Sequence, residues 1–175
     1  MIRIEDFLGG FYDEFPFVPR ELPPREIVVR LAGLIAGPSV HPSATIEPGA
    51  VVKPPAVIGA GCFVAATAYL RGGVVLGPGV TVGPGVEIKA SLVMGGSALA
   101  HFNYVGDSLI GRDVNLEAGA VIANFRNEAP ARTGKFGAVI GDHCRIGANA
   151  VLAPGTILAP RTIVPRLALV DQGGG

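Results

Sequence analysis

An apolar residue recurs at every sixth position through most of the chain, with small and polar residues between. One run extends from Val40 to Met94, a second from Tyr104 to Ile122, and a third begins at Ile140. Each six-residue unit combines a short apolar segment with a turn. Such a hexapeptide repeat is typical of a parallel β-helix. We therefore predict an all-β fold, a single-stranded parallel β-helix over residues 37–175, in which three repeats form one triangular coil of about eighteen residues.

The repeat is interrupted twice. Met94 and Tyr104 are ten positions apart, which predicts a slip of the register and a bulge of the backbone between them. The stretch 123–139 is polar, basic and without the repeat, so we predict a loop that leaves the coil. Function in repeat proteins is often carried by such insertions.

Residues 1–36 lack the repeat. Aromatic residues cluster between Phe7 and Phe17, and Pro23-Pro24 precedes apolar positions with helical spacing, which predicts a short helix over 25–35. The open end of a solenoid needs a cover, so we expect residues 1–36 to form a helical cap on the first coil.

Composition narrows the possible functions. The formal net charge is zero, which removes the electrostatic argument for binding nucleic acid. Pro or Gly interrupts each apolar stretch, so no membrane span is expected, and the acidic start is unlike a signal peptide. A cytoplasmic protein is the expectation. Cys62 and Cys144 occupy a repeat position that small residues otherwise fill, which predicts buried, reduced thiols.

Three cations form a predicted column. Residues one coil apart should lie above one another, about 4.8 Å apart, and Lys53, Arg71 and Lys89 have that spacing. Like charges so close repel by about 1 kcal/mol per pair even in water. We expect Lys53 to splay into solvent and pair with Glu47 or Glu87. For Arg71 and Lys89 we expect an anionic ligand, with phosphate the natural candidate.

His101 is the histidine with a candidate chemical role. It lies inside the predicted slip, where irregular backbone beside a cation pair could hold a general base. Spacing alone leaves a structural role equally open. His41 and His143 are expected at the surface, and no metal site is expected, because no histidine or cysteine spacing suits zinc.

A family resemblance rests on segments 86–89, 101–107 and 110–115, and continues through 119–124, 135–136 and 140–142. Residues 70–160 resemble the C-terminal acetyltransferase domain of the bifunctional bacterial enzyme that acetylates glucosamine-1-phosphate and then uridylylates the product. They also resemble the β-helix tails of archaeal sugar-1-phosphate nucleotidylyltransferases. The resemblance implies a left-handed coil, acetyl-CoA as co-substrate, and a homotrimer with sites between subunits.

The resemblance also implies roles for single residues. His101 matches the general base, and Asn124 matches an amide that orients the substrate near the reacting amine. Arg71 and Lys89 match ligands of the sugar phosphate. Three further positions match contacts with the substrate: Tyr104, Asn115 and Lys135.

The cofactor positions depart from the family pattern. Ala148 stands where a serine often meets the cofactor, and Phe125 stands where a tyrosine is usual. The loop 126–134 is longer, and the repeat stops near Val170, so we expect the family's C-terminal cofactor arm to be missing. Arg161 and Arg166 could bind the CoA phosphates instead, or could be solvated surface residues. Residues 1–36 are too short for a nucleotide-binding sheet, so no pyrophosphorylase activity is expected.

We therefore predict a CoA-dependent N-acyltransferase acting on an amino-sugar phosphate or a related small phosphorylated amine. The alternative is a non-catalytic β-helix subunit or regulator that binds sugar nucleotides or a partner nucleotidylyltransferase. The departures at Phe125 and Ala148 favour this alternative, and the presence of His101 and Lys89 argues against it. A γ-class carbonic anhydrase on the same fold fails for lack of suitably spaced histidines.

Overall fold

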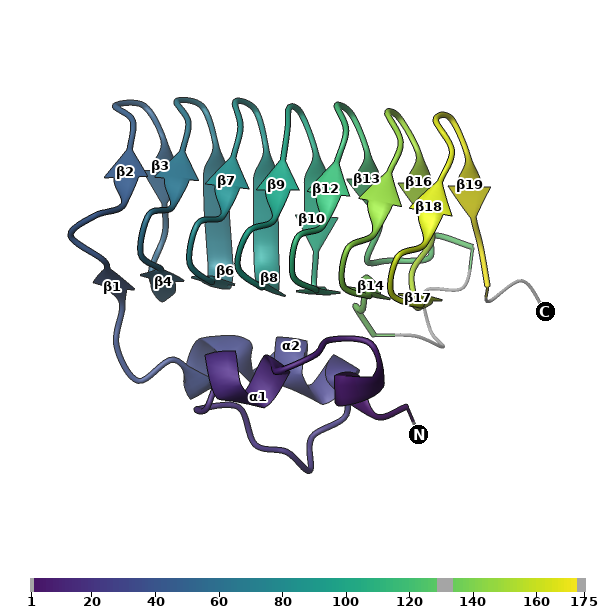
Figure 1. The fold of residues 1–175 in the computed structure, drawn as a ribbon, viewed down its shortest axis with the longest axis horizontal. Coiled ribbons are helices and arrows are strands. Elements are labelled where there is room, and N and C mark those ends of the chain that lie inside the picture. Colours follow the sequence, from purple (N-terminus) through teal and green to yellow (C-terminus); the bar gives the residue numbers. More distant parts are fainter. Residues whose placement is uncertain (1, 129–133, 173–175) are drawn as a thin grey trace.

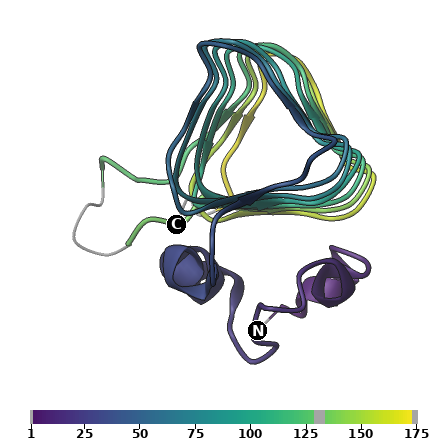
Figure 2. The same ribbon diagram turned by 90° about the vertical axis from the view of Figure 1, so that its left-hand side faces the viewer.

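The computed structural model describes residues 2–128 and 134–172, which form a prism of parallel strands with a helical segment along one side (Figure 1). Seen along its axis, the strand region has a triangular outline with three flat faces (Figure 2). From β1 through β2 and β3 the chain turns counter-clockwise as it recedes from the viewer of Figure 2, so the coil is left-handed. The predicted left-handed parallel β-helix is confirmed.

We name the faces A, B and C in the order in which the chain enters them. Face A, beside the helices, contains β1 (Ser39–Val40), β4 (Ala56–Ile58), the second half of β6 (Tyr69–Leu76), the second half of β8 (Glu87–Val93), β11 (Leu109–Ile110), β14 (Ala138–Ile140) and β17 (Thr156–Leu158). Face B contains β2 (Thr45–Ile46), β5 (Phe63–Val64), β7 (Thr81–Val82), β9 (Ala98–Leu99), β12 (Asn115–Leu116), β15 (Arg145–Ile146) and β18 (Ile163–Val164). Face C contains β3 (Val51–Val52), the first halves of β6 and β8, β10 (Tyr104–Gly106), β13 (Val121–Ile122), β16 (Val151–Leu152) and β19 (Leu169–Val170).

Stacked aliphatic side chains fill the prism. Side chains alternate along a strand, so each short strand turns one residue inward, and the inward residues of successive coils lie on one another. On face C this column includes Leu70, Ile88, Val105, Ile122 and Leu152, all buried. Burying such a side chain contributes about 1.5–3 kcal/mol, so these columns are the main source of stability.

The coil shortens by one residue at the corner between faces C and A, which we call the CA corner. Arg71 pairs with Lys89, but Val74 already pairs with Ser91, so Ala90 alone stands opposite two glycines. The next coil keeps the short corner, with Asp107 (φ 47°) in the place of Ala90 (φ 46°). Serine hydroxyls complete the hydrogen bonding there, because Ser91 Oγ accepts from the Ser108 N–H at 3.0 Å.

Two predicted core positions are wrong because of this shortening. Val93 and Val105 point into the prism where we expected Met94 and Tyr104. Met94 is buried on the outer side, under the helical segment. β7 and β9 pair in regular parallel register, so the expected bulge between Met94 and Tyr104 is also wrong. The irregularity lies instead at the CA corner.

The N-terminal segment contains a 3₁₀ turn η1 (Ile4–Asp6), a short helix α1 (Phe11–Glu14) and a longer helix α2 (Pro24–Leu34). It does not cap the first coil, so that expectation is wrong. The segment lies along face A (Figure 1). Its apolar side chains pack on the outward residues Val75, Leu92, Leu109 and Val139. The outer surface of face A is apolar, and a cover along the face removes more of it from water than a cap at one end could.

Polar contacts fix the segment in place. The Glu14 carboxylate accepts a hydrogen bond from the Gly95 N–H at 2.7 Å and pairs with Arg112 at 2.9 Å. Asp142 accepts from the Gly9 N–H at 2.8 Å. Gly73 also matters, because a Cβ there would lie 2.9 Å from the backbone nitrogen of Ala32 in α2. In the described part of the chain no helix is long and apolar enough to cross a membrane.

Candidate active site

The predicted column of cations exists at the end of the face C strands. Arg71 and Lys89 are register partners on adjacent coils. Lys53 continues the column, and its Nζ lies 5.2 Å from the centre of the Tyr69 ring, so its head rests on an aromatic face. The expected pairing of Lys53 with Glu47 or Glu87 is therefore wrong.

Two carboxylates neutralise the other members of the column. Arg71 is paired with Glu87 at 2.6 Å, and its pKa is raised by this hydrogen bond. Lys89 is held more deeply, with its Nζ 2.7 Å from both carboxylate oxygens of Asp107. The side chain of Asp107 is 6 % exposed, against 32 % for Glu87, so the second pair is the better shielded one.

Asn124 and Tyr104 complete a cluster around Asp107. The Asn124 amide nitrogen donates to Oδ2 of Asp107. A Cβ added at Gly106 would lie 2.7 Å from that nitrogen and 2.8 Å from the Tyr104 hydroxyl, so both groups pack over this glycine. Burial raises the pKa of Tyr104, with further increases from the Asp107 and Glu87 charges. The phenol is therefore neutral and able to donate a hydrogen bond at physiological pH.

The loop leaves the coil at this same corner (Figure 2). Asn124 begins it, and its carbonyl accepts from the Phe136 N–H at 3.0 Å, while Asp107 accepts from the Gly137 N–H at 2.9 Å. Both ends of the loop are thus tied to the cluster. Lys135 is exposed where the loop returns to the coil, and Phe125 is 40 % exposed beside Asn124. Residues 129–133 of the predicted loop lie outside the described residues.

His101 lies at a different corner, between faces B and C, which we call the BC corner. It is exposed and precedes β10, whereas Asp107 follows the end of that strand. Six residues of extended chain span roughly 15–20 Å, so the imidazole and the cluster lie at opposite edges of face C. The turn at His101 is regular: its neighbour Phe102 has φ 52°, as Thr67 (φ 68°) and Asn149 (φ 55°) do in their own coils.

Asn115 lies on face B, away from the cluster. It lines a surface groove with Arg145 and Ile163, and pairs with Ala98 and Arg145 on the neighbouring coils. The structure therefore brings together Arg71, Lys89, Tyr104 and Asn124, but not His101 or Asn115 within one chain. Lys135 precedes Phe136, whose N–H donates to the Asn124 carbonyl.

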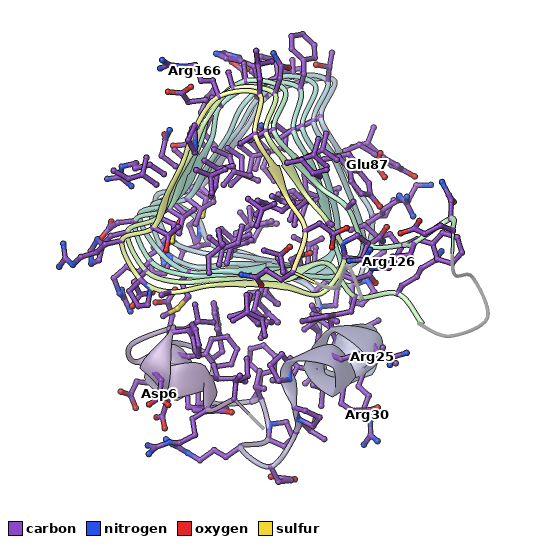
Figure 3. The ribbon with its side chains drawn as sticks, turned by 90° about the vertical axis from the view of Figure 1, so that its right-hand side faces the viewer. Asp6, Arg25, Arg30, Glu87, Arg126 and Arg166 are labelled. Carbon is purple, nitrogen blue, oxygen red and sulfur yellow. The ribbon has the colours of Figure 1, made fainter. Side chains whose placement is uncertain are left out.

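The three predicted cofactor residues are also divided. Ala148 and Arg166 share the BC corner, where Figure 3 shows Arg166 far from Arg126 at the loop. Glu117 links them: its carboxylate pairs with the Arg166 guanidinium at 2.7 Å and accepts from the Ala148 N–H at 2.8 Å. These two contacts lower the pKa of Glu117. Arg161 is exposed at the corner between faces A and B.

The other histidines and the cysteines lie as the sequence indicated. His41 is exposed and bonded to Ser43, and His143 is at the surface, 3.6 Å from Asp113. Cys62 and Cys144 are free and buried, and burial raises the pKa of both thiols. Within the described ranges, no group of three or more His, Cys, Asp or Glu side chains could hold a metal ion.

Sequence reasoning missed Asp107 as a member of the site. The signal was available, since the column spacing of Lys53, Arg71 and Lys89 continues to Asp107.

Comparison with known proteins identifies the coil. Residues 64–172, more than half of the chain, match the family model described as the GMPPB C-terminal domain. The chain belongs to the GMPPB C-terminal domain family. The matched residues begin in the second coil of the β-helix, so the helical segment along face A lies outside the part that this family defines.

Two relatives of the chain have names that describe bifunctional proteins. The chain is 37 % identical over 101 residues to a "bifunctional sugar-1-phosphate nucleotidylyltransferase/acetyltransferase" of Sulfurisphaera tokodaii, covering 51 % of this chain and 25 % of that protein. It is 36 % identical over 97 residues to the "bifunctional protein GlmU" of Methanococcus vannielii, covering 49 % and 23 %. The chain thus spans about a quarter of the length of the curated relatives it matches.

A solved structure of an Arabidopsis UDP-N-acetylglucosamine acyltransferase covers 75 % of this chain and 58 % of its own, with 20 % identity and a TM-score of 0.44. A likeness at this level says nothing about function.

Proposed function

We propose that this chain is a CoA-dependent N-acyltransferase that transfers an acetyl group from acetyl-CoA to an amino-sugar phosphate. The observation that carries the proposal is the cluster at the CA corner, where Arg71, Lys89, Tyr104 and Asn124 meet at the root of the loop. These are the residues to which the family resemblance assigns the sugar phosphate and the reacting amine. The names of the relatives, which include an acetyltransferase, support the same class of reaction.

The reaction needs a neutral amine, because a protonated amine has no lone pair to attack a thioester. His101, as general base, would take one proton from the amine while the amine nitrogen forms a bond to the carbonyl carbon of the thioester. Asn124 would orient the amine as the tetrahedral intermediate forms. The C–S bond then breaks, and the CoA sulfur leaves as a thiolate that takes up a proton. Positioning both reactants this way supplies much of the rate gain in such transfers.

The phosphate of the acceptor would bind at Arg71. Its guanidinium is about one-third exposed and is held by Glu87, so an incoming phosphate competes with that carboxylate. Lys89 is more fully engaged by Asp107 and supplies positive potential nearby. Lys135, exposed on the loop, would approach the sugar from the solvent side.

A complete site requires more than one copy of the chain. Asn115 on face B and Asn124 at the end of face C cannot touch one small substrate within a single prism. We propose a homotrimer in which face B of one copy meets face C of the next, which brings Asn115 of one copy toward the cluster of its neighbour. CoA would then run along the BC corner past Ala148, with Arg166 and the more distant Arg161 as candidates for its phosphates. We place this enzyme in the cytoplasm.

A screen of amino-sugar phosphates with acetyl-CoA, following release of the free thiol, tests the proposal. We expect turnover with at least one acceptor, and we expect His101→Ala to abolish it while the circular dichroism spectrum stays unchanged. Full activity of that variant would refute the base assignment. No turnover with any acceptor would refute the proposed reaction.

One observation favours a second candidate, a non-catalytic subunit or regulator. Glu117 engages both Arg166 and the Ala148 N–H, and so occupies two of the proposed cofactor contacts. If calorimetry detects no binding of acetyl-CoA, this second candidate is the better account, and sugar nucleotides or a partner nucleotidylyltransferase become the ligands to test.

A further inference from the structure

The carboxylate of Asp107 is the centre of the buried polar cluster. Asp107 is 4 % exposed, and its two oxygens receive the Lys89 ammonium, at 2.7 Å each, and the Asn124 amide nitrogen. The family resemblance gives this residue no role. Its carboxylate nevertheless lies under Lys89, Asn124 and Tyr104, three side chains of the proposed site.

Asp107 decides which way the Asn124 amide points. An ionised carboxylate accepts hydrogen bonds and donates none, so the nitrogen of Asn124 must face it. The nitrogen also lies beside the Tyr104 hydroxyl, with which the Asn124 amide shares a hydrogen bond. The amide oxygen, Oδ1, then faces the other way. Asn124 is 8 % exposed, and its Oδ1 is not among the fully buried side-chain atoms that lack a partner in the described ranges, so this oxygen reaches the surface of the cluster.

The backbone holds Asp107 in this place from both sides. Its N–H donates to the Lys89 carbonyl at 2.8 Å, and its carbonyl accepts from Gly137 on the returning loop at 2.9 Å. The one-residue CA corner gives Asp107 a positive φ of 47°, which turns its side chain under Lys89. A corner of two residues, as at Gly72 and Gly73, would change this direction.

We propose that Asp107 is a positioning residue that fixes the Asn124 amide with its oxygen outward and the Lys89 ammonium beside it. The proposal rests on the proposed function, and it makes the outward oxygen the specificity element for an amine acceptor. A neutral primary amine has two N–H groups, so it can give one hydrogen to Asn124 and the other to the base while its lone pair attacks. A hydroxyl has one hydrogen, which it cannot give to both.

The test compares Asp107→Asn with Asp113→Asn. Asp113 is also a corner residue with positive φ (54°), between faces A and B, but its side chain is 46 % exposed and remote from the cluster, which makes it a matched control. The first readout is hydrogen exchange of the Asn124 side-chain amide by NMR, assigned from its loss in Asn124→Leu. We expect exchange about tenfold to a hundredfold faster in Asp107→Asn, because an anchoring charge-assisted hydrogen bond is lost, and no change in the control.

The second readout is kinetic. In Asp107→Asn we expect kcat for an amino-sugar phosphate to fall by about a hundredfold, since misplacement of a substrate-orienting group is costly, while KM for acetyl-CoA stays unchanged. We also expect the preference for amine over hydroxyl acceptors to shrink. If the single variant does not fold, the charge-neutral double variant Lys89→Gln/Asp107→Asn replaces it in both readouts.

The outcomes separate the two proposals. Unchanged exchange of the Asn124 amide in Asp107→Asn would overturn the positioning role, and so would a faster exchange with unaltered kcat and acceptor preference. If the wild-type chain acetylates no acceptor, the proposed function fails, and the amide exchange still decides whether Asp107 sets the orientation of Asn124.

Discussion

The charge of the CA corner depends on two carboxylates that stacking places beside two cations. Arg71 with Glu87, and Lys89 with Asp107, give this surface little net charge despite its column of basic residues. The Arg71 pair is partly exposed and is worth little by itself. Arg71 is therefore the cation that can change partners when a ligand arrives, and Lys89 is the one that stays in place.

Replacing Arg71 should weaken acceptor binding more than it slows the chemistry. For Arg71→Ala we expect KM for a phosphorylated acceptor to rise about tenfold to a hundredfold with kcat little changed, because a charge-assisted contact made in the ground state is lost. Lys53→Ala is the matched control from the same column, since its ammonium rests on Tyr69 outside the cluster. Steady-state kinetics measure both, and an equal rise in KM for the two variants would contradict this assignment.

The buried thiols make stability fall at alkaline pH. Burial raises the pKa of Cys62 and Cys144 above the ordinary value of 9.0, so their thiols stay protonated in the folded state at a pH where the unfolded chain ionises. Their contribution is complete below pH 9.0 and is lost as the pH rises through the folded pKa. We expect the free energy of unfolding in urea to drop as the pH rises above 9.0.

A double variant with alanine at both cysteines isolates this effect. It should lose most of the drop over that range, because alanine does not titrate. The wild-type thiols should also react with a disulfide reagent only after unfolding. Rapid reaction of the folded protein would show that the thiols are accessible and the argument wrong.

At the scale of the element, the N-terminal segment is a side wall of the prism. Leu92 of β8 is fully buried under the helices, whereas Val29, also an apolar residue, is 62 % exposed on the outer side of α2. We expect Leu92→Ala to lower the free energy of unfolding by about 2–5 kcal/mol. Val29→Ala should change it by less than about 0.5 kcal/mol. Equal effects in denaturant unfolding would mean that the segment does not dock on face A.

Much of the β-helix, but not the length of its corners, could be predicted from the sequence. The hexapeptide repeat predicted the coil, its faces and the stacking of Arg71 on Lys89, because inward and outward positions follow from spacing alone. It failed at Met94 and Tyr104, since an apolar residue hidden under an outer layer has the same pattern as one inside. The one-residue corners at Ala90 and Asp107 could not be predicted, because the number of residues in a corner is fixed by backbone geometry and not by hydrophobicity.

For the candidate site, the sequence predicted the cations of the column but not the carboxylates that pair with them. Extending the spacing by one coil would have found Asp107 under Lys89. The position of His101 was misjudged for a different reason: the expected bulge made its turn look special, whereas the structure gives every coil a similar turn at the BC corner. The separation of His101 and Asn115 from the cluster follows from the faces that they occupy.

At the scale of the whole molecule, the helices leave faces B and C for contacts between copies. Face A is covered by the chain's own N-terminal segment, so a neighbouring prism cannot pack directly on it (Figure 2). Asn115 faces outward on B and the cluster lies at the edge of C. A closed ring of three copies with B against C uses both exposed faces of every chain, as a heterologous interface that closes must.

Mixing two weakened variants tests this assembly. Asn115→Ala and Asn124→Ala should each reduce kcat/KM by about a hundredfold as pure trimers, because each removes a substrate contact. If every site takes Asn115 from one copy and Asn124 from its neighbour, co-refolding equal amounts should restore about a quarter of wild-type activity, since a quarter of random neighbours pair two intact residues. Light scattering must show that the mixed species keep a mass of about three chains. Stable mixed trimers that remain as inactive as their parents would show that Asn115 and Asn124 of neighbouring copies do not share a site. That outcome would contradict the B-against-C arrangement.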